Sequence, residues 1–189
     1  MNFKEEFLQI ACRNVTREGI QEFLNWLVST DFFTAPASTR YHGAWEGGLV
    51  QHSLNVYAQL KKLCKCYECD ATSETIALVS LFHDVCKANV YKTEMRWRKN
   101  SQQQWEQYPT YTFKEDFAFG GHGSKSVYLI QSFMKLTPEE ASAINCHMGQ
   151  WDSTTYSNPT EVYCRNLLAW LLHVADEAAD FIVESNKEV

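Results

Sequence analysis

Residues 73–87 read SETIALVSLFHDVCK, and this stretch decides the fold. Its middle, IALVSLF, is apolar at almost every position, so a helix formed here would have little surface to offer to solvent. Ser73 precedes the apolar run and belongs to the residue types that cap helices. The pattern predicts a central, buried helix over residues 74–86 that carries a histidine and an aspartate near its end.

The adjacent His83 and Asp84 need an explanation, because ionisable side chains are rarely buried unless they are paired or bind a metal ion. A divalent cation supplies one. Imidazole nitrogens and carboxylate oxygens are suitable ligands for zinc, iron, manganese, cobalt or nickel. The two oxygens of Asp84 could also bridge two such ions.

Further candidate ligands lie on both sides of this helix, each separated from the next by enough chain for one helix and a connection. Ligands on separate helices meet only through the fold, as they do in the cores of helical bundles. We therefore expect one ligand group per helix. The candidate metal ligands are His52, His83, Asp84, His122, His147 and Asp176.

The remainder of the chain predicts more helices and one hairpin. Apolar residues recur at helical intervals over residues 3–11, 17–28, 49–64, 123–134, 137–149 and 161–184. Thr16 is a candidate cap, the run Thr137-Pro138-Glu139-Glu140 predicts a capping box, and Gly149 a helix end.

Residues 90–113 alternate polar and apolar side chains instead, which predicts a β-hairpin between two helices. The fold class is therefore all-α, a helical bundle with an inserted β-hairpin. No linker or repeat divides the chain. We expect a single domain over residues 1–189, with a helical cover at 1–39 and a core at 40–180.

Length, composition and net charge limit the possible partners and cellular location of the protein. The chain has 189 residues, of which 45% are hydrophobic, so one substantial core can form. Its formal net charge of -6 excludes extended coating of nucleic acid but permits a local phosphate site. No apolar stretch is long enough for a bilayer, no signal segment is apparent, and the seven cysteines do not form a secreted framework. We expect a cytoplasmic protein without a membrane partner.

The order H…HD…D in His52, His83-Asp84 and Asp176 resembles the HD-domain superfamily of metal-dependent phosphohydrolases, over residues 40–180. The stretch YHGAWEGGLVQHSL at residues 41–54 looks like the corresponding segment of HD-type 3′-to-5′ exoribonucleases. The resemblance implies an HD-domain helical bundle and hydrolysis of a phosphoester. Where those families commonly carry Ile-Gly-Lys after HD, this chain has Val85-Cys86-Lys87, which keeps the lysine and replaces the glycine.

The resemblance also extends to a second metal ion. His122 and His147 are similar to the two extra histidines of the two-metal branch, which includes HD-GYP phosphodiesterases and myo-inositol oxygenase-like enzymes. The resemblance implies that the site holds one or two divalent ions. The metal could be Mn, Fe, Ni, Co, Zn or Mg.

For catalysis, the expected residues are Asp84, which would hold the ion and orient water, and two lysines, Lys87 and Lys125, which could contact phosphate oxygens. By resemblance, the substrate is a nucleotide or a short oligonucleotide. His42 and His173 are weaker candidates for ligands, and Arg40 could contact phosphate. A base could stack on Trp45, Trp97, Trp105 or Trp151.

Two alternatives remain open at this point. The same ligand order permits a mixed-valent di-iron oxygenase, which oxygen consumption by an iron-loaded sample would reveal. A non-catalytic nucleotide-binding module would instead bind nucleotide tightly without forming product.

Overall fold

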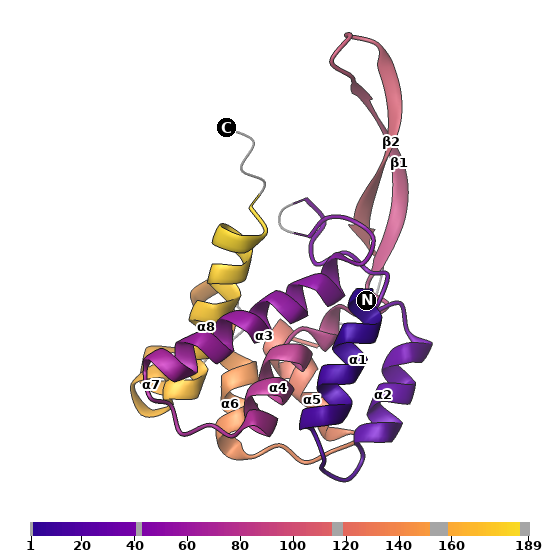
Figure 1. Cartoon of the computed structure of the whole chain (residues 1–189). Helices are drawn as coiled ribbons and strands as arrows, with labels where there is room; N and C mark the ends of the chain where they lie inside the picture. The colour runs from indigo at the N-terminus through magenta and orange to yellow at the C-terminus, as the bar shows by residue number, and fades with distance from the viewer. Residues whose placement is uncertain (1, 41–42, 115–118, 152–158, 186–189) are drawn as a thin grey trace.

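The computed structural model of the chain describes residues 2–40, 43–114, 119–151 and 159–185, and it is mainly helical with one two-stranded antiparallel sheet (Figure 1). This confirms the predicted helical class and the hairpin. Among the described residues, no helix is both long enough and apolar enough to cross a lipid bilayer. The elements are α1 Phe3–Asn14, α2 Ile20–Ser29, α3 Gly48–Cys66, α4 Ser73–Phe82, β1 Tyr91–Lys99, β2 Trp105–Phe113, α5 His122–Gln131, α6 Pro138–Cys146, α7 Pro159–Arg165 and α8 Leu167–Ala178.

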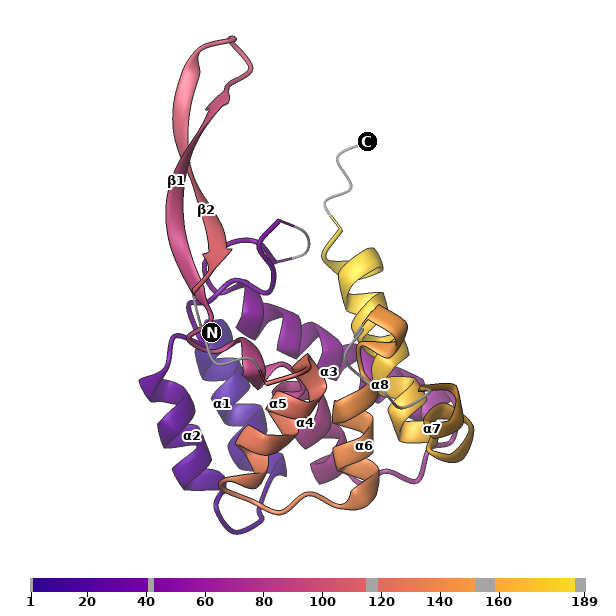
Figure 2. The ribbon, with the colours of Figure 1, turned by 180° about the vertical axis from the view of Figure 1, so that it is seen from behind.

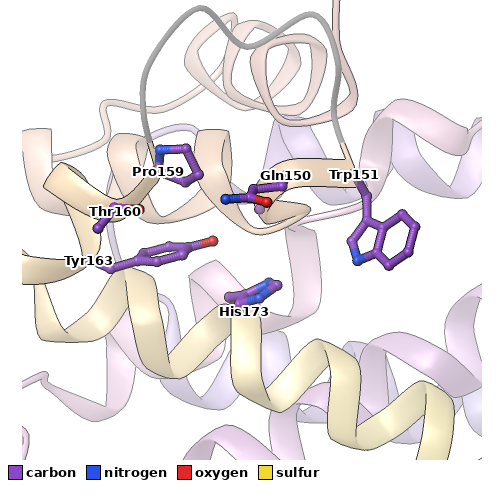
Figure 3. Close-up of a pocket in the computed structure, with 7 residues that line it drawn as sticks. Gln150, Trp151, Pro159, Thr160, Tyr163 and His173 are labelled. Atoms are coloured by element: carbon purple, nitrogen blue, oxygen red, sulfur yellow. The ribbon is translucent and has the colours of Figure 1, made fainter.

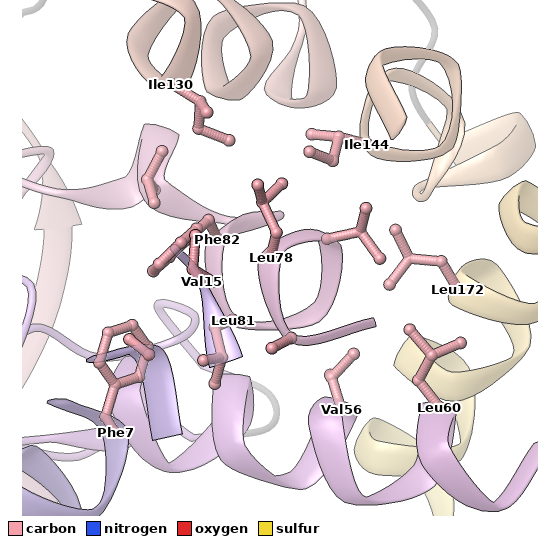
Figure 4. Packing of buried hydrophobic residues seen from close by; sticks show 14 of the residues in the cluster. Phe7, Val15, Val56, Leu60, Leu78, Leu81, Phe82, Ile130, Ile144 and Leu172 are labelled. Carbon is pink, nitrogen blue, oxygen red and sulfur yellow. The ribbon is translucent and has the colours of Figure 1, made fainter. Parts of the chain in front are cut away.

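Helix α4 is the centre of the bundle, as its apolar sequence predicts. Residues 77–82 are all buried, and Leu78 lies among side chains of α3, α5, α6 and α8, including Leu60, Ile130 and Leu172 (Figure 4). A helix surrounded on all sides has a fixed position, so groups at its end are held in place. This is the physical basis for placing a site there.

The ends of α4 differ from the prediction in two respects. Its cap is Thr72, whose hydroxyl accepts a hydrogen bond from the Thr75 N–H, so Ser73 is the first helical residue instead of the cap. The helix ends at Phe82, and residues 85–87 form a separate 3₁₀ turn. Asp84, with φ −109° and ψ 20°, lies between the two and turns the chain out of the helix.

Helices α1 and α2 cover one side of α4 through aromatic packing. The rings of Phe7 and Phe23 lie 5.8 and 4.8 Å from that of Phe82. The prediction of Thr16 as the cap of α2 is wrong, because the helix begins after Gly19, whose φ is +91°. The Thr16 N–H donates to Glu74 instead, which joins the turn before α2 to α4.

The hairpin projects away from the helices, as two opposite views show (Figures 1 and 2). Its register pairs Tyr91 with Phe113 and Lys99 with Trp105. Because paired residues share a face, Met95, Trp97 and Trp105 lie on one side together with Phe113. All four are more than half exposed.

The predicted single helix over residues 161–184 is broken in two. Asn166 has extended backbone angles, and its side chain caps α8 by accepting from the Ala169 N–H. Its amide also donates to the Glu139 carbonyl and the Ser142 hydroxyl of α6. After α8, residues 179–183 continue as a π-helical turn that leads to Glu184.

Candidate metal centre

Five buried ionisable side chains from four elements converge beside the C-terminal end of α4. We call this group the central cluster. Helix α3 packs against α4 and α8, and α6 packs against α8, so these elements bring distant parts of the chain together. The central cluster consists of His52 from α3, His83 and Asp84 from the end of α4, His147 from the end of α6, and Asp176 from α8.

His83 and His147 are oriented by the same local device. Each is the residue that follows the last turn of its helix, and each Nδ1–H donates to the carbonyl oxygen three residues earlier, Ser80 at 2.8 Å and Ile144 at 2.7 Å. Helix ends leave such carbonyls without partners, so the bonds satisfy them. Because a carbonyl only accepts, the neutral form of each ring keeps its lone pair on Nε2, beyond the helix end.

His52 is oriented by carboxylates instead of a carbonyl. Its Nδ1 lies 3.1 Å from Glu184 Oε1 and 3.3 Å from Asp180 Oδ1, so Nδ1–H is the donor on that side. The opposite nitrogen, Nε2, faces the central cluster. The orientation of all three imidazoles is therefore set from outside the cluster, a common property of metal-binding histidines.

Inside the cluster, groups that accept hydrogen bonds face one another. His52 Nε2 lies 3.3 Å from His83 Nε2 and 3.0 Å from Asp176 Oδ1, and His83 Nε2 lies 3.6 Å from the same oxygen. His147 Nε2 lies 3.4 Å from Asp84 Oδ1 and has no hydrogen-bond partner among the described residues. Acceptors this close require a shared positive charge, either a proton or a metal ion. The donor set therefore fits a divalent cation.

The pKa values show how strongly these groups favour positive charge between them. Burial lowers the pKa of His52, but hydrogen bonds with Asp176 and Glu184 outweigh it and raise that pKa to about 10. Burial raises the pKa of Asp176, whereas the hydrogen bonds from His52 and His83 bring it well below the usual range. A proton held between His52 and Asp176 and a bound cation are alternatives at this point, so binding of the cation would release the proton.

Lys87 lies against Asp84, as its place one turn later predicts. Its ammonium is buried and lies 2.6 Å from Asp84 Oδ2. Burial lowers the pKa of Lys87, but the charge of Asp84 more than compensates and raises it. The pKa of Asp84 is held well below its usual range by Lys87 and the cluster histidines, against the effect of burial. Both groups are therefore charged.

His122 is separated from the other predicted ligands. Its Nδ1 lies 3.6 Å from the Cys86 sulfur, and potential ligand atoms of Asp84, Cys86 and His122 lie within 4.8 Å of one another. Lys125, one turn later on α5, is close enough to influence the pKa of the Cys86 thiol, which burial and Asp84 raise to about 12. The predicted ligands thus form two adjoining groups that share Asp84.

Sequence reasoning missed Glu184 and assigned no role to Asp180. Asn55 donates to Glu184 Oε1 at 2.9 Å, the oxygen that also faces His52. The available signal was periodicity, because Asp176, Asp180 and Glu184 follow one another at four-residue intervals. His42 lies outside the described residues.

A surface pocket of about 450 Å³ is lined by residues that include Trp151, Tyr163 and His173 (Figure 3). His173 Nδ1–H donates to the His147 carbonyl at 2.7 Å, and the ring of His173 stacks on Tyr163 at 5.3 Å. The Tyr163 hydroxyl donates to the Cys146 carbonyl. Burial raises the pKa of Tyr163, and the nearby charge of Asp176 adds to this rise. Trp151 lies across the pocket from Tyr163 and is 75% exposed.

Together, the helical bundle and its buried imidazole–carboxylate cluster define a class of helical proteins whose core could hold a divalent metal ion. The family model of the HD domain matches residues 49–179, more than half of the chain. The chain therefore belongs to the HD domain family, whose superfamily consists generally of metal-dependent hydrolases. Comparisons with curated proteins and with solved structures gave no match.

Proposed function

We propose that this protein is a phosphohydrolase that acts on a phosphoester of a nucleotide or short oligonucleotide, with His52, His83, Asp84 and Asp176 as the principal metal ligands. One observation carries the proposal: the Nε2 atoms of His52 and His83 and an oxygen of Asp176 lie within 3.6 Å of one another, where only positive charge reconciles them. We also propose two further metal ligands, His147 within the central cluster and His122 in the adjoining group.

When bound, a divalent cation supplies Lewis-acid chemistry, because it polarises a phosphoryl oxygen and makes water a stronger nucleophile at neutral pH. The chain contributes the geometry. Glu184 and Asp180 hold His52, and helix-end carbonyls hold His83 and His147, so the ligands need little reorganisation. In this role Asp84, whose Oδ2 contacts Lys87 and whose Oδ1 faces His147, would hold the ion and orient the attacking water.

Lys87 and Lys125 supply positive charge for the phosphate. The Lys87 ammonium keeps its charge although it is buried, and in this role it contacts a phosphoryl oxygen as well as Asp84. Lys125 approaches from α5, on the side of Cys86. Fixed cations in a site that excludes water stabilise developing negative charge far more than exposed ones.

The pocket beside the cluster supports a nucleotide as the substrate. It is lined by aromatic rings, and His173 turns Nε2 away from the carbonyl that its Nδ1–H contacts, so Nε2 can accept a hydrogen bond from a base or sugar. Trp151 offers an exposed ring for stacking. A nucleoside in this pocket would place its phosphate toward Asp176 and His147.

The test is hydrolysis of nitrophenyl phosphate, bis-nitrophenyl phosphate and a panel of nucleotides and short oligonucleotides with added Mn²⁺. We expect metal-dependent product release, reduced more than about 100-fold in Asp84→Ala, since loss of a ligand exceeds the effect of losing a supporting residue. Asp70→Ala removes an exposed aspartate and is the matched control. Normal turnover by a folded Asp84→Ala protein would exclude the proposal, and oxygen consumption or tight binding without product would favour the alternatives.

A further inference from the structure

The two oxygens of Asp84 face different partners. Oδ2 contacts the Lys87 ammonium at 2.6 Å and also lies 3.6 Å from His83 Nε2 and 3.9 Å from His52 Nε2, on the side of the principal ligands. Oδ1 lies 3.9 Å from the Cys86 sulfur, as well as 3.4 Å from His147. A carboxylate in this orientation can bind one cation through each oxygen, so Asp84 is placed to bridge two positions.

Cys86 and His122 lie together on the Oδ1 side and are held there by the backbone. The Cys86 N–H donates to the hydroxyl of Ser126 on α5 at 3.2 Å, which fixes the 3₁₀ turn against that helix. Gly123 lies so close to α6 that a Cβ atom there would be 2.3 Å from the Asn145 carbonyl oxygen. The start of α5, and with it His122, therefore cannot move closer to α6.

From this geometry we propose that Asp84, Cys86 and His122 form a second cation position with a thiolate ligand, which selects Zn²⁺ or Fe²⁺ over Mg²⁺ and Mn²⁺. We call it the thiol position. This inference rests on the proposed metal centre, because the two positions share Asp84. It adds a ligand, Cys86, and a metal preference that the histidines and carboxylates alone do not impose.

The choice of metal follows from ligand chemistry. A thiolate is a soft ligand and favours zinc and iron, whereas magnesium and manganese favour carboxylate, carbonyl and water oxygens. Binding forms a metal–sulfur bond and breaks the S–H bond, and the proton passes to solvent. Three protein ligands leave at least one open coordination place for water or substrate.

A different cysteine group provides a stringent control. Cys64 is buried and close enough to Cys69 for the two thiols to interact, on the opposite end of α3 from Gly48. Any metal–thiolate signal could in principle originate there. Comparing Cys86→Ser with Cys64→Ser removes one buried thiol in each case and separates the two sources.

The experiment is titration of the metal-stripped full chain with Co²⁺ in reducing buffer, read by the sulfur-to-cobalt charge-transfer absorption and by elemental analysis of bound cobalt. We expect two equivalents in the wild type and the charge-transfer band with one of them. In Cys86→Ser the band should vanish and affinity for that equivalent should fall by more than the 10- to 100-fold typical of a lost supporting residue. The Cys64→Ser variant should still bind two equivalents of cobalt and should keep the charge-transfer band.

The outcomes separate this inference from the proposed function. If the wild type binds cobalt without the band, or if the band survives in Cys86→Ser, the thiol position is refuted while the principal ligands stand. If no cobalt binds, both fail. Cys86→Ala, compared with wild type by circular dichroism and thermal unfolding, guards against a folding defect, and loss of the band in that folded variant supports the thiol position.

Discussion

The Nδ1–H of His52 donates to Glu184 Oε1 at 3.1 Å, across 132 residues of chain. This bond joins α3 to the turn after α8 and directs Nε2 toward His83 and Asp176. It also gives Glu184 a part in the proposed metal centre, because Glu184 positions His52, a proposed ligand.

Glu184→Ala should therefore weaken metal binding while leaving the bundle folded. We expect affinity for Zn²⁺ to fall by about 10- to 100-fold, because His52 loses the partner that fixes its orientation. Competition with a chromophoric chelator measures this directly. Glu161→Ala removes a surface glutamate that pairs with Arg165 and should bind zinc like the wild type. Equal affinity in both variants would remove Glu184 from the centre.

Stability in acid should depend on Glu140. Burial raises the pKa of this carboxyl, but hydrogen bonds from Arg17, Thr137 and Thr75 outweigh it, so the folded pKa lies below the ordinary value of 4.5. A lowered folded pKa means that the stabilisation is present above the unfolded pKa and is lost as pH falls through the folded one. The stability advantage of wild type over Glu140→Gln should be largest near neutral pH and should shrink below about pH 4. Urea unfolding at several pH values measures it, and a difference that does not change with pH would contradict the assignment.

The partner of Glu140 should matter at neutral pH. Arg17 contacts both oxygens of Glu140, at 2.8 and 3.0 Å, and its removal would leave a buried carboxylate without its cation. We expect Arg17→Met to lower the free energy of unfolding by about 2 to 3 kcal/mol, less than for a fully buried pair because Arg17 is partly exposed. Arg165→Met, at an exposed pair, should change it by less than about 0.5 kcal/mol. Urea midpoints compare the two.

Gly19 and Gly120 form a matched pair of positions. Both have positive φ, +91° and +92°. A Cβ at Gly19 would lie 1.9 Å from the Phe133 carbonyl oxygen, whereas a Cβ at Gly120 would have no atom of the described residues within 4 Å except those of its chain neighbours. Alanine at Gly120 should cost about 1 kcal/mol from backbone strain alone. Gly19→Ala should cost distinctly more, because α2 must move away from the end of α5. Equal effects in denaturant unfolding would show that the close approach is unimportant.

The pocket should distinguish nucleotides from small esters. Trp151→Ala should raise KM for a nucleotide substrate about tenfold, the order expected for loss of one stacked base, and should leave KM for a non-aromatic ester such as glycerol phosphate unchanged. Trp105→Ala removes a similarly exposed ring near the end of the hairpin and is the control for a mononucleotide. A rise in KM for both substrates would place Trp151 outside base recognition.

The fold was largely predictable because its signals are local. Residues 76–82 are apolar on every face of the helix that they form, which marked it as the central helix. The Thr137–Glu140 capping box also lies where the sequence predicts it. The ends of the helices were less predictable. Thr72 and Ser73 are both suitable caps, and only the observed hydrogen bond selects Thr72. The break at Asn166 depends on contacts with α6, which no window around residue 166 contains.

The sequence by itself determined which side chains are available for a metal and that the helix carrying His83 and Asp84 is buried. Only the tertiary structure decided how they are arranged: Nε2 of His52 faces inward because Glu184 holds Nδ1, and His122 lies beside Cys86. Helix formation and capping are set by neighbours three or four residues apart. The convergence of ligands from different helices instead depends on how those helices pack, which arises only when the whole core forms.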